Sequence, residues 1–485
     1  MSPIAEKTQD SALMAADPRR SDGPWIYLLV ASLAAWFPII RPYLRMGDDF
    51  HFAGWILSGG VPLYFREYGV WRLIGHESGA YAAFTNPLFP GLLAIATHTV
   101  AALLFLSVLR RLLASQPLAL LLALIFAAFP WGDTALLWAS EYTYLLSTTL
   151  FIAVLCLLFR VFPLRDALAI PLCALLATLS LLSHEALFFA MLISGGLALL
   201  RDDDKPIRTR LPLAAAPAAG TFIWWLLFKI FPGRIPPEHI HLNPRTLLSG
   251  IYYQYTNLWV FQPWASAATR NLLFFGWSVA QFILAAILVG AVLFCLVRTK
   301  PASAAISPQP LRDNRLFIFL FLLLMATVAI YAIGGGFSLD CRKKYPIIPV
   351  LLMAIGYAID RYAPQSIKWP RINRPTILAV TLCGIATTWL QIGLWRYEAT
   401  RLDLLVNLLT TQRNPAAVHV NWDSRIQAAW PHANQFWGAP VEDWVLADAI
   451  RFKTQISPPN QHSSPIESVK FDPDTFLWQP SGITP

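Results

Sequence analysis

Residues 87–109 read PLFPGLLAIATHTVAALLFLSVL, an apolar run that contains no Asp, Glu, Lys or Arg. As a helix, a run of this length spans the roughly 30 Å of hydrocarbon in a bilayer. The run ends at Arg110 and Arg111, which are typical of a loop outside the apolar region. The stretch therefore predicts a transmembrane helix followed by a basic loop.

Similar apolar runs recur along the chain. We expect an all-α polytopic membrane protein with about eleven transmembrane helices, in a range of about 10–13. The predicted spans lie at about residues 24–43, 87–109, 115–131, 134–160, 167–183, 185–200, 211–231, 272–298, 315–336, 345–360 and 374–395.

The composition agrees with a membrane protein and excludes a soluble globular one. Of the 485 residues, 56% are hydrophobic and only 13% are charged, and the mean hydropathy is +0.51. The net charge of +9 comes from basic residues spread through short loops, so membrane lipids, and no nucleic acid, are the expected partners. The five cysteines are too scattered for a disulfide framework.

Charge alternates between successive loops. Arg110, Arg160 and the run 201–210 all fall on the side of the N-terminus, so the positive-inside rule predicts that this side is cytoplasmic. We expect a multi-pass protein of a bacterial-type inner (plasma) membrane. Its predicted parts are a cytoplasmic tail (1–23), a transmembrane domain (24–395) with outer loops 44–86, 232–271 and 334–345, and an extracytoplasmic C-terminal segment (396–485).

Two adjacent carboxylates, Asp48 and Asp49, open the first outer loop. The alternation of apolar, aromatic and charged residues after them predicts short interfacial helices in this loop. A carboxylate at such a boundary can act as a general base on an acceptor hydroxyl, because partial desolvation and a like-charged neighbour raise its pKa. The alternative is that one Asp caps the following helix.

Three further candidates are Glu141, His184 and Glu185, in or beside apolar runs near the outer side. Charge placed there is costly unless it faces a polar cavity, so we expect all three to contribute to substrate binding. Glu141 is expected about two turns inside its span. The alternatives are a structural hydrogen bond for Glu141, a helix start at Glu185 and a solvated His184.

The last outer loop carries three consecutive cations, Arg342, Lys343 and Lys344, followed by Tyr345. Basic residues on the outer side run against the positive-inside trend, and Arg and Lys suit a lipid-linked phosphate. We therefore predict that these four residues bind substrate. Contact with ordinary anionic headgroups is the alternative.

Other ionisable residues are weaker candidates, and we expect most of them to be solvated loop residues. Asp202–Asp204 lacks a surrounding strand and helix pattern, and His239 with His241 lacks a third metal ligand. The remaining weak candidates are Arg66, Arg72, His76, Glu77, Arg234 and Arg245.

Gly47, Asp48 and Asp49 after the first span, together with the order of the outer loops, resemble the GT-C superfamily of integral-membrane glycosyltransferases. This superfamily includes protein O-mannosyltransferases and aminoarabinose transferases, and the likeness covers residues 24–395. The resemblance implies a glycosyltransferase that moves a sugar from a polyprenyl-phosphate-linked donor to a lipid or glycan acceptor at the outer membrane face. Asp48 or Asp49 then matches the family's catalytic acid position. No second acidic motif of the kind found in the oligosaccharyl branch of the superfamily is evident, so a divalent metal cofactor is left open.

Two other functions remain open at this point. A transporter or flippase of a lipid-linked saccharide would tend to show repeated halves and midplane charges, and the sequence shows neither. A glycan polymerase or ligase with a polyprenyl-pyrophosphate donor would use the same basic loop. The predicted chemistry is inverting transfer, in which an Asp is the base and the cations stabilise the leaving phosphate.

Overall fold

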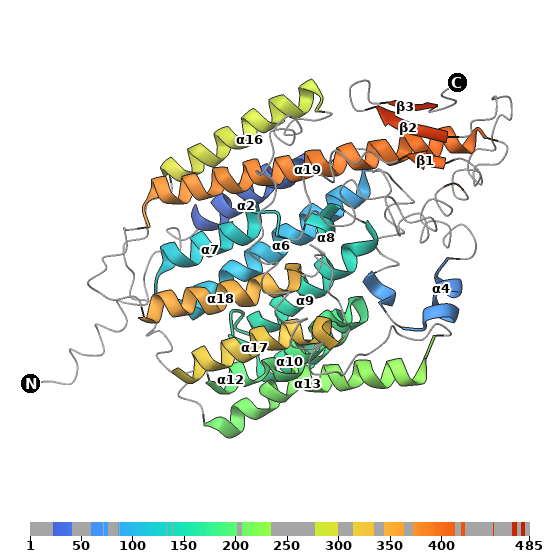
Figure 1. The fold of residues 1–485 in the computed structure, drawn as a ribbon. Helices are drawn as coiled ribbons and strands as arrows, with labels where there is room; N and C mark the ends of the chain where they lie inside the picture. Colours follow the sequence, from blue (N-terminus) through green and yellow to red (C-terminus); the bar gives the residue numbers. More distant parts are fainter. Residues whose placement is uncertain are drawn as a thin grey trace, which may run out of the picture.

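The structure, a computed structural model, is a bundle of helices with a small sheet near the C-terminus (Figure 1). It describes residues 23–40, 60–70, 72–75, 86, 88–131, 133–137, 139–200, 206–233, 277–298, 314–333, 344–362, 372–412, 419–421, 450, 468–472 and 477–480. The helices before residue 201 are α2 (Gly23–Trp36), η2 (Phe37–Ile39), α4 (Gly60–Tyr68), α6 (Phe89–Leu112), α7 (Gln116–Ala128), α8 (Asp133–Leu137), η3 (Ala139–Glu141), α9 (Tyr142–Leu158), α10 (Asp166–Ser183), η4 (Glu185–Leu187), α11 (Phe188–Ser194) and α12 (Gly196–Leu200). The later elements are α13 (Ile207–Ile230), α16 (Val279–Arg298), α17 (Asn314–Ile333), α18 (Lys344–Tyr362), α19 (Arg374–Thr410), β1 (His419–Asn421), β2 (Ser468–Asp472) and β3 (Leu477–Pro480).

Among the described residues, each predicted apolar run coincides with one, two or three helical elements. Four helices are long and apolar enough to cross a membrane, namely α6, α10, α13 and α19, and further apolar helices are shorter. These helices indicate a helical membrane protein. The number of eleven spans stays a prediction, because length and composition support only four among the described residues.

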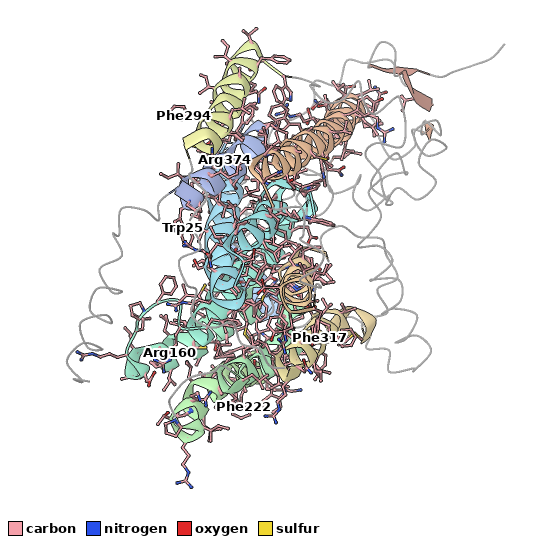
Figure 2. The ribbon with its side chains drawn as sticks, turned by 90° about the vertical axis from the view of Figure 1, so that its left-hand side faces the viewer. Trp25, Arg160, Phe222, Phe294, Phe317 and Arg374 are labelled. Atoms are coloured by element: carbon pink, nitrogen blue, oxygen red, sulfur yellow. The ribbon has the colours of Figure 1, made fainter. Side chains whose placement is uncertain are left out.

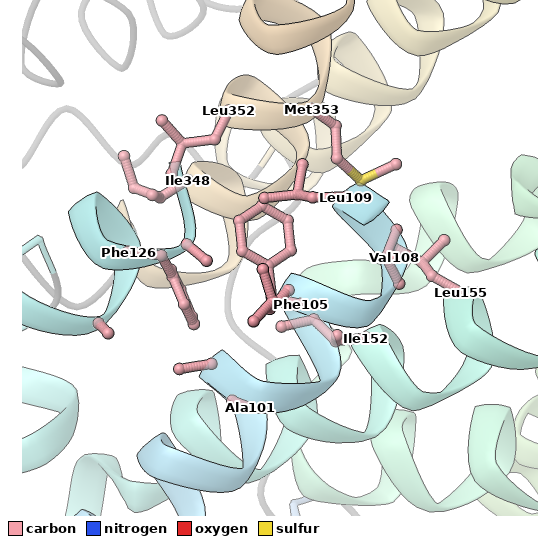
Figure 3. Close-up of a cluster of buried hydrophobic side chains, with 14 of the residues drawn as sticks. Ala101, Phe105, Val108, Leu109, Phe126, Ile152, Leu155, Ile348, Leu352 and Met353 are labelled. Atoms are coloured by element: carbon pink, nitrogen blue, oxygen red, sulfur yellow. The ribbon is translucent and has the colours of Figure 1, made fainter. Parts of the chain in front are cut away.

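The interior of the bundle is built from one face of each helix. Residues three or four positions apart share a helix face, so α6 presents a continuous apolar stripe to its neighbours. Figure 3 shows this stripe meeting side chains of α7, α9 and α18. The labelled residues are Ala101, Phe105, Val108, Leu109, Phe126, Ile152, Leu155, Ile348, Leu352 and Met353. At the periphery, α13 and α16 instead expose large apolar side chains such as Phe222 and Phe294, as a lipid-facing surface would.

Close approach of α10 and α13 depends on a glycine. A Cβ on Gly220 would lie 2.2 Å from the carbonyl oxygen of Ala174. The Thr178 hydroxyl donates a hydrogen bond of 3.0 Å to the Gly220 carbonyl across the same contact. Small residues and interhelical hydrogen bonds of this kind are what holds helices together in lipid.

One end of the bundle, which we call the basic end, gathers residues from several predicted basic loops. The Arg110 guanidinium lies 5.6 Å from the ring centre of Trp25, at the start of α2. Asp360, near the end of α18, accepts hydrogen bonds from two backbone amides just before α7. Figure 2 views the bundle from this side and shows Trp25, Arg160 and Arg374. These loops therefore share one end of the structure, and the side of a membrane that it faces stays a prediction.

Helix α19 continues past the predicted end of the last span at residue 395 and ends only at Thr410. The boundary drawn between residues 395 and 396 therefore falls inside a helix. Beyond it, β1 pairs parallel to β2, and β2 pairs antiparallel to β3, with Val469 opposite Pro480. These strands were not predicted, and in Figure 1 they lie beside the far end of α19.

Candidate functional site

The end of the bundle opposite the basic end carries a segment that crosses several helix ends. We call this segment, residues 60–70 and 72–75, the strap; it comprises α4 and the turn after it, and Figure 1 shows α4 beyond the bundle. Gly69 forms an antiparallel bridge with Pro232, just after α13. Its φ of 63° lies in the left-handed region, and a Cβ there would lie 2.1 Å from the Phe231 carbonyl oxygen. The strap therefore brings the first predicted outer loop against the start of the second.

Arg72 fastens the strap to the turn between α10 and α11. Its Nε donates a hydrogen bond of 2.9 Å to Oε2 of Glu185, and its Nη2 donates to Oε1 of the same carboxylate. The two side chains are 21% and 22% exposed, so the pair is mostly removed from solvent. A planar guanidinium that grips both oxygens of a carboxylate fixes its orientation as well as its charge.

Gly75 lets the strap dock into a notch between α9 and α10. A Cβ on Gly75 would lie 2.7 Å from the carbonyl oxygen of Ser183 and 2.7 Å from Cγ2 of Thr143. No side chain larger than hydrogen fits there without moving backbone. The contact places Arg72, three residues earlier, beside the first turn of α9.

His184 is the residue before the short helix η4 and is only 2% exposed. The Ala186 amide donates a hydrogen bond of 3.0 Å to Nδ1 of His184, so this nitrogen carries no proton in that arrangement. The imidazole packs on the ring of Tyr144, with ring centres 3.8 Å apart. The alternative of a solvated His184 is therefore wrong, because the ring is used to cap η4 and to pack on α9.

Glu185 begins η4, as the helix-start alternative predicted, and in addition pairs with Arg72. Its Oε2 lies 3.7 Å from Nδ1 of His184. One carboxylate therefore sits at the meeting point of the strap, the end of α10 and the start of α11.

Glu141 is 4% exposed and ends η3, directly before α9. The predicted span is not one continuous helix, because helical structure in residues 133–158 is divided into α8, η3 and α9. The expected depth of Glu141, about two turns inside the span, stays a prediction. Glu141 lies close enough to Arg72 to stabilise the positive charge of its guanidinium.

The charge of Arg72 is stabilised by this surrounding. Burial lowers the pKa of the guanidinium, but Glu185, Tyr144 and Glu141 together outweigh burial and hold the pKa above its ordinary value. Arg72 thus carries a positive charge that Glu185 binds directly and that Glu141 also stabilises. The expectation that Arg72 is a solvated loop residue is wrong, whereas Arg66, which pairs with its neighbour Glu67 and is 56% exposed, fits it.

A second polar group lies deeper, where α6, α7 and α18 meet. Nε2 of His98 is 3.0 Å from the Ala127 carbonyl, which can only accept, so Nδ1 is left to accept from the Tyr345 hydroxyl at 2.7 Å. The Trp36 indole donates to the same Ala127 carbonyl at 2.9 Å. Tyr345 is 1% exposed, so the structure uses it to bind α18 to α6. Its role in substrate binding stays a prediction.

The two polar groups are joined through the start of α9. Tyr142, the residue after Glu141, shares a hydrogen bond of 2.8 Å with Thr97, and Thr97 precedes His98 on α6. From His98 to the end of α6 at Leu112, the buried residues of this helix are mainly apolar and belong to the stripe drawn in Figure 3. The ionisable and hydroxyl side chains therefore concentrate toward one end of the bundle.

We find no match to this sequence among models of known protein families or among characterised proteins.

Several predicted site residues lie outside the described residues. Lys344 begins α18, but the structure describes its backbone alone. The others outside the described residues are Asp48, Asp49, Arg342, Lys343, His76, Glu77, Asp202–Asp204, Arg234, His239, His241 and Arg245. Within the described ranges, no three His, Cys, Asp or Glu side chains come together as a metal site.

Sequence reasoning did not single out His98, Arg396 or Arg401. Arg396 and Arg401 are 3% and 2% exposed on the part of α19 that follows the predicted span. The guanidinium of Arg396 donates to the Pro38 carbonyl of η2. The sequence does indicate that Arg396 and Arg401 lie on a helix, because no Pro or Gly separates them from the end of the predicted apolar run, and a helix is then favoured to continue.

Chemically, the site joins one guanidinium, two carboxylates and an imidazole at a single helix-bundle end. A carboxylate that already accepts two hydrogen bonds from Arg72 is poorly suited to take a proton, so Glu185 fits an orienting role. A catalytic base would have to come from another residue.

Proposed function

We propose that this protein is a membrane glycosyltransferase of the GT-C type. It moves a sugar from a polyprenyl-phosphate-linked donor to a hydroxyl of a lipid or glycan acceptor, at the outer face of a bacterial-type inner membrane. In this proposal about eleven helices span the membrane, the basic end faces the cytoplasm, and the end that carries the strap faces outward.

The observation that carries the proposal is the gathering of Arg72, Glu141, His184 and Glu185 at one end of the bundle. An enzyme that joins a lipid-borne donor to a water-borne acceptor needs its charged groups where the bilayer meets water. A transporter more often places such groups near the midplane. The location at the helix ends therefore supports transfer at the membrane surface.

The described residues nearest in sequence to both halves of the proposed catalytic group lie at this same end. The main chain before Asp48 is described up to Ile40, after η2, which packs against the start of α6. Asp48 follows eight residues later, a reach of at most about 28 Å. Lys344 starts α18, whose other end lies at the basic end with Asp360. The connections thus support one site built from Asp48 or Asp49 and the Arg342–Lys344 cluster.

The proposed reaction is a single inverting displacement. Asp48 or Asp49 takes the proton of the acceptor hydroxyl while its oxygen attacks the anomeric carbon of the donor. The bond from that carbon to the phosphate oxygen breaks, and the polyprenyl phosphate leaves with the electron pair. Arg342, Lys343 and Lys344 stabilise the negative charge that grows on the phosphate.

The test uses the full-length protein in nanodiscs with defined polyprenyl-phosphate sugars and lipid or glycan acceptors. We expect sugar transfer by the native protein and a loss of about 100-fold or more in Asp48→Asn or Asp49→Asn, because general-base catalysis contributes about this much. Asp166→Asn is the matched control, since Asp166 is a carboxylate that pairs with Arg160 at the basic end.

Equal turnover by both Asp variants and the native protein would remove the proposed base. Absence of transfer with every donor, accompanied by movement of a labelled donor between leaflets, would replace the enzyme with a transporter.

A further inference from the structure

Besides the packing of Gly75 against Ser183 and Thr143, two attachments at separated places hold the strap. At one, Gly69 bridges to Pro232, and the Phe65 ring packs on Phe231 with ring centres 5.7 Å apart. At the other, Arg72 grips Glu185. The first attachment ties the strap to α13, and the second ties it to the turn that follows α10. Arg72 therefore provides a charged attachment to the residue after His184, close to the point where Gly75 packs on α9.

Arg72 occupies a backbone conformation that is unfavourable for its residue type. Its φ of 49° lies in the left-handed region, where a residue with a Cβ is uncommon and strained. Such a conformation persists only where the surroundings over-determine it. Here the compensating interaction is the two-point contact of its own side chain with Glu185.

The geometry argues against Arg72 as a direct ligand of a phosphate. Two of its three guanidinium nitrogens donate to one carboxylate, and Glu141 adds a second negative charge nearby. A phosphate approaching this guanidinium would be repelled by the carboxylate of Glu185, which is bound to it. The positive charge of Arg72 is already paired with Glu185 inside the protein, so Arg72 has a structural role.

We infer that Arg72 is a positioning residue. Through its contact with Glu185 it attaches the strap to the helix ends, and it thereby holds the first outer loop in a fixed position relative to the site. This inference rests on the proposed function, because the loop that contains the strap also supplies Asp48 and Asp49. Glu185 is the anchor on the bundle side. Neither residue takes part in bond making or breaking.

The first measurement is hydrogen exchange of the full-length protein in nanodiscs. Arg72→Gln and Glu185→Gln should each speed exchange of the strap amides by about tenfold or more. The reason is that loss of a hydrogen bond to a charged group makes local opening of the strap more favourable by about this factor. Exchange in α6 should stay unchanged. The control is Arg66→Gln, which removes a cation of the strap whose partner is its own neighbour.

The second measurement separates positioning from substrate binding by steady-state kinetics with a polyprenyl-phosphate sugar. We expect Arg72→Gln to lower kcat by about tenfold or more with little change in the donor KM, and Arg72→Lys to restore part of the rate. A raised donor KM with an unchanged kcat would assign Arg72 to donor binding and overturn the inference.

Unchanged exchange of the strap in both variants would overturn the inference as well. If the native protein transfers no sugar, the proposed function fails, and the exchange measurement alone decides whether Arg72 and Glu185 fasten the strap. The two failures are thus distinguishable.

Discussion

The guanidinium of Arg72 donates two hydrogen bonds to the carboxylate of Glu185 across 113 positions of the chain. One partner lies in a turn between helices and the other begins a single helical turn. The contact therefore joins two segments that local structure alone would leave independent.

The stability of this pair is the first prediction. We expect Arg72→Gln and Glu185→Gln each to lower the free energy of unfolding by about 1–3 kcal/mol, because each leaves a mostly buried charge without its partner. The double variant should lose less than the sum, since the residues share one interaction. Unfolding in detergent followed by tryptophan fluorescence measures this, with Arg66→Gln expected within about 0.5 kcal/mol of the native protein. Additive losses would contradict a direct coupling.

The pH dependence of the pair is the second prediction. The folded-state pKa of Arg72 is raised, so its charge contributes stability that is fully present at every pH below the strongly alkaline pKa of an unfolded arginine. This contribution is lost only as the pH rises through the still higher folded-state pKa. The penalty of Arg72→Gln should therefore be equal between about pH 6 and about pH 9. A penalty that shrinks as the pH rises within this range would show that the guanidinium is not the group responsible.

The hydrogen bond between Tyr345 and His98 gives the third prediction. Tyr345→Phe removes the hydroxyl that donates to Nδ1 of His98, so it should cost about 1–3 kcal/mol of stability. Tyr362→Phe is the matched control, because its hydroxyl bonds Asn314 at an exposed position, and it should cost less than about 0.5 kcal/mol. Thermal unfolding of the two variants compares them, and equal losses would count against a structural role for the buried tyrosine.

The contact between α10 and α13 gives the fourth prediction. Gly220→Ala places a Cβ against Ala174 and Ala177, and overpacking of this kind costs about 1–3 kcal/mol. Gly290→Ala in α16 meets nothing within 4 Å and should leave stability unchanged or raise it slightly, by up to about 1 kcal/mol. The midpoint of unfolding distinguishes the two. A stable Gly220→Ala variant would show that the helices can separate without loss.

The helices themselves were readable from the sequence, because an apolar run such as residues 87–109 has few other ways to satisfy its backbone in lipid. The grouping of Arg110 with the start of α2 was readable too, from the alternation of basic loops. The length of α19 was missed for a physical reason. Its residues past 395 are polar enough to end a span, yet Leu402, Leu405, Val406 and Leu409 keep a helical spacing that favours continuation.

The composition of the site could be predicted only in part. Glu141, His184 and Glu185 were singled out because charge beside an apolar run is costly, and the structure brings them to one end. The role of Arg72 could not be read, because its partner depends on how the strap packs against η4. The burial of Tyr345 was equally unreadable, since it depends on a histidine on another helix.

The length of helix α19 bears on the position of the C-terminal sheet. Its 37 residues measure about 55 Å, whereas the hydrocarbon layer is about 30 Å thick. A rigid rod that crosses such a layer leaves roughly 25 Å standing clear of it. Strand β3 packs against α19, so a change in the tilt of this helix in the bilayer would move the C-terminal sheet with it.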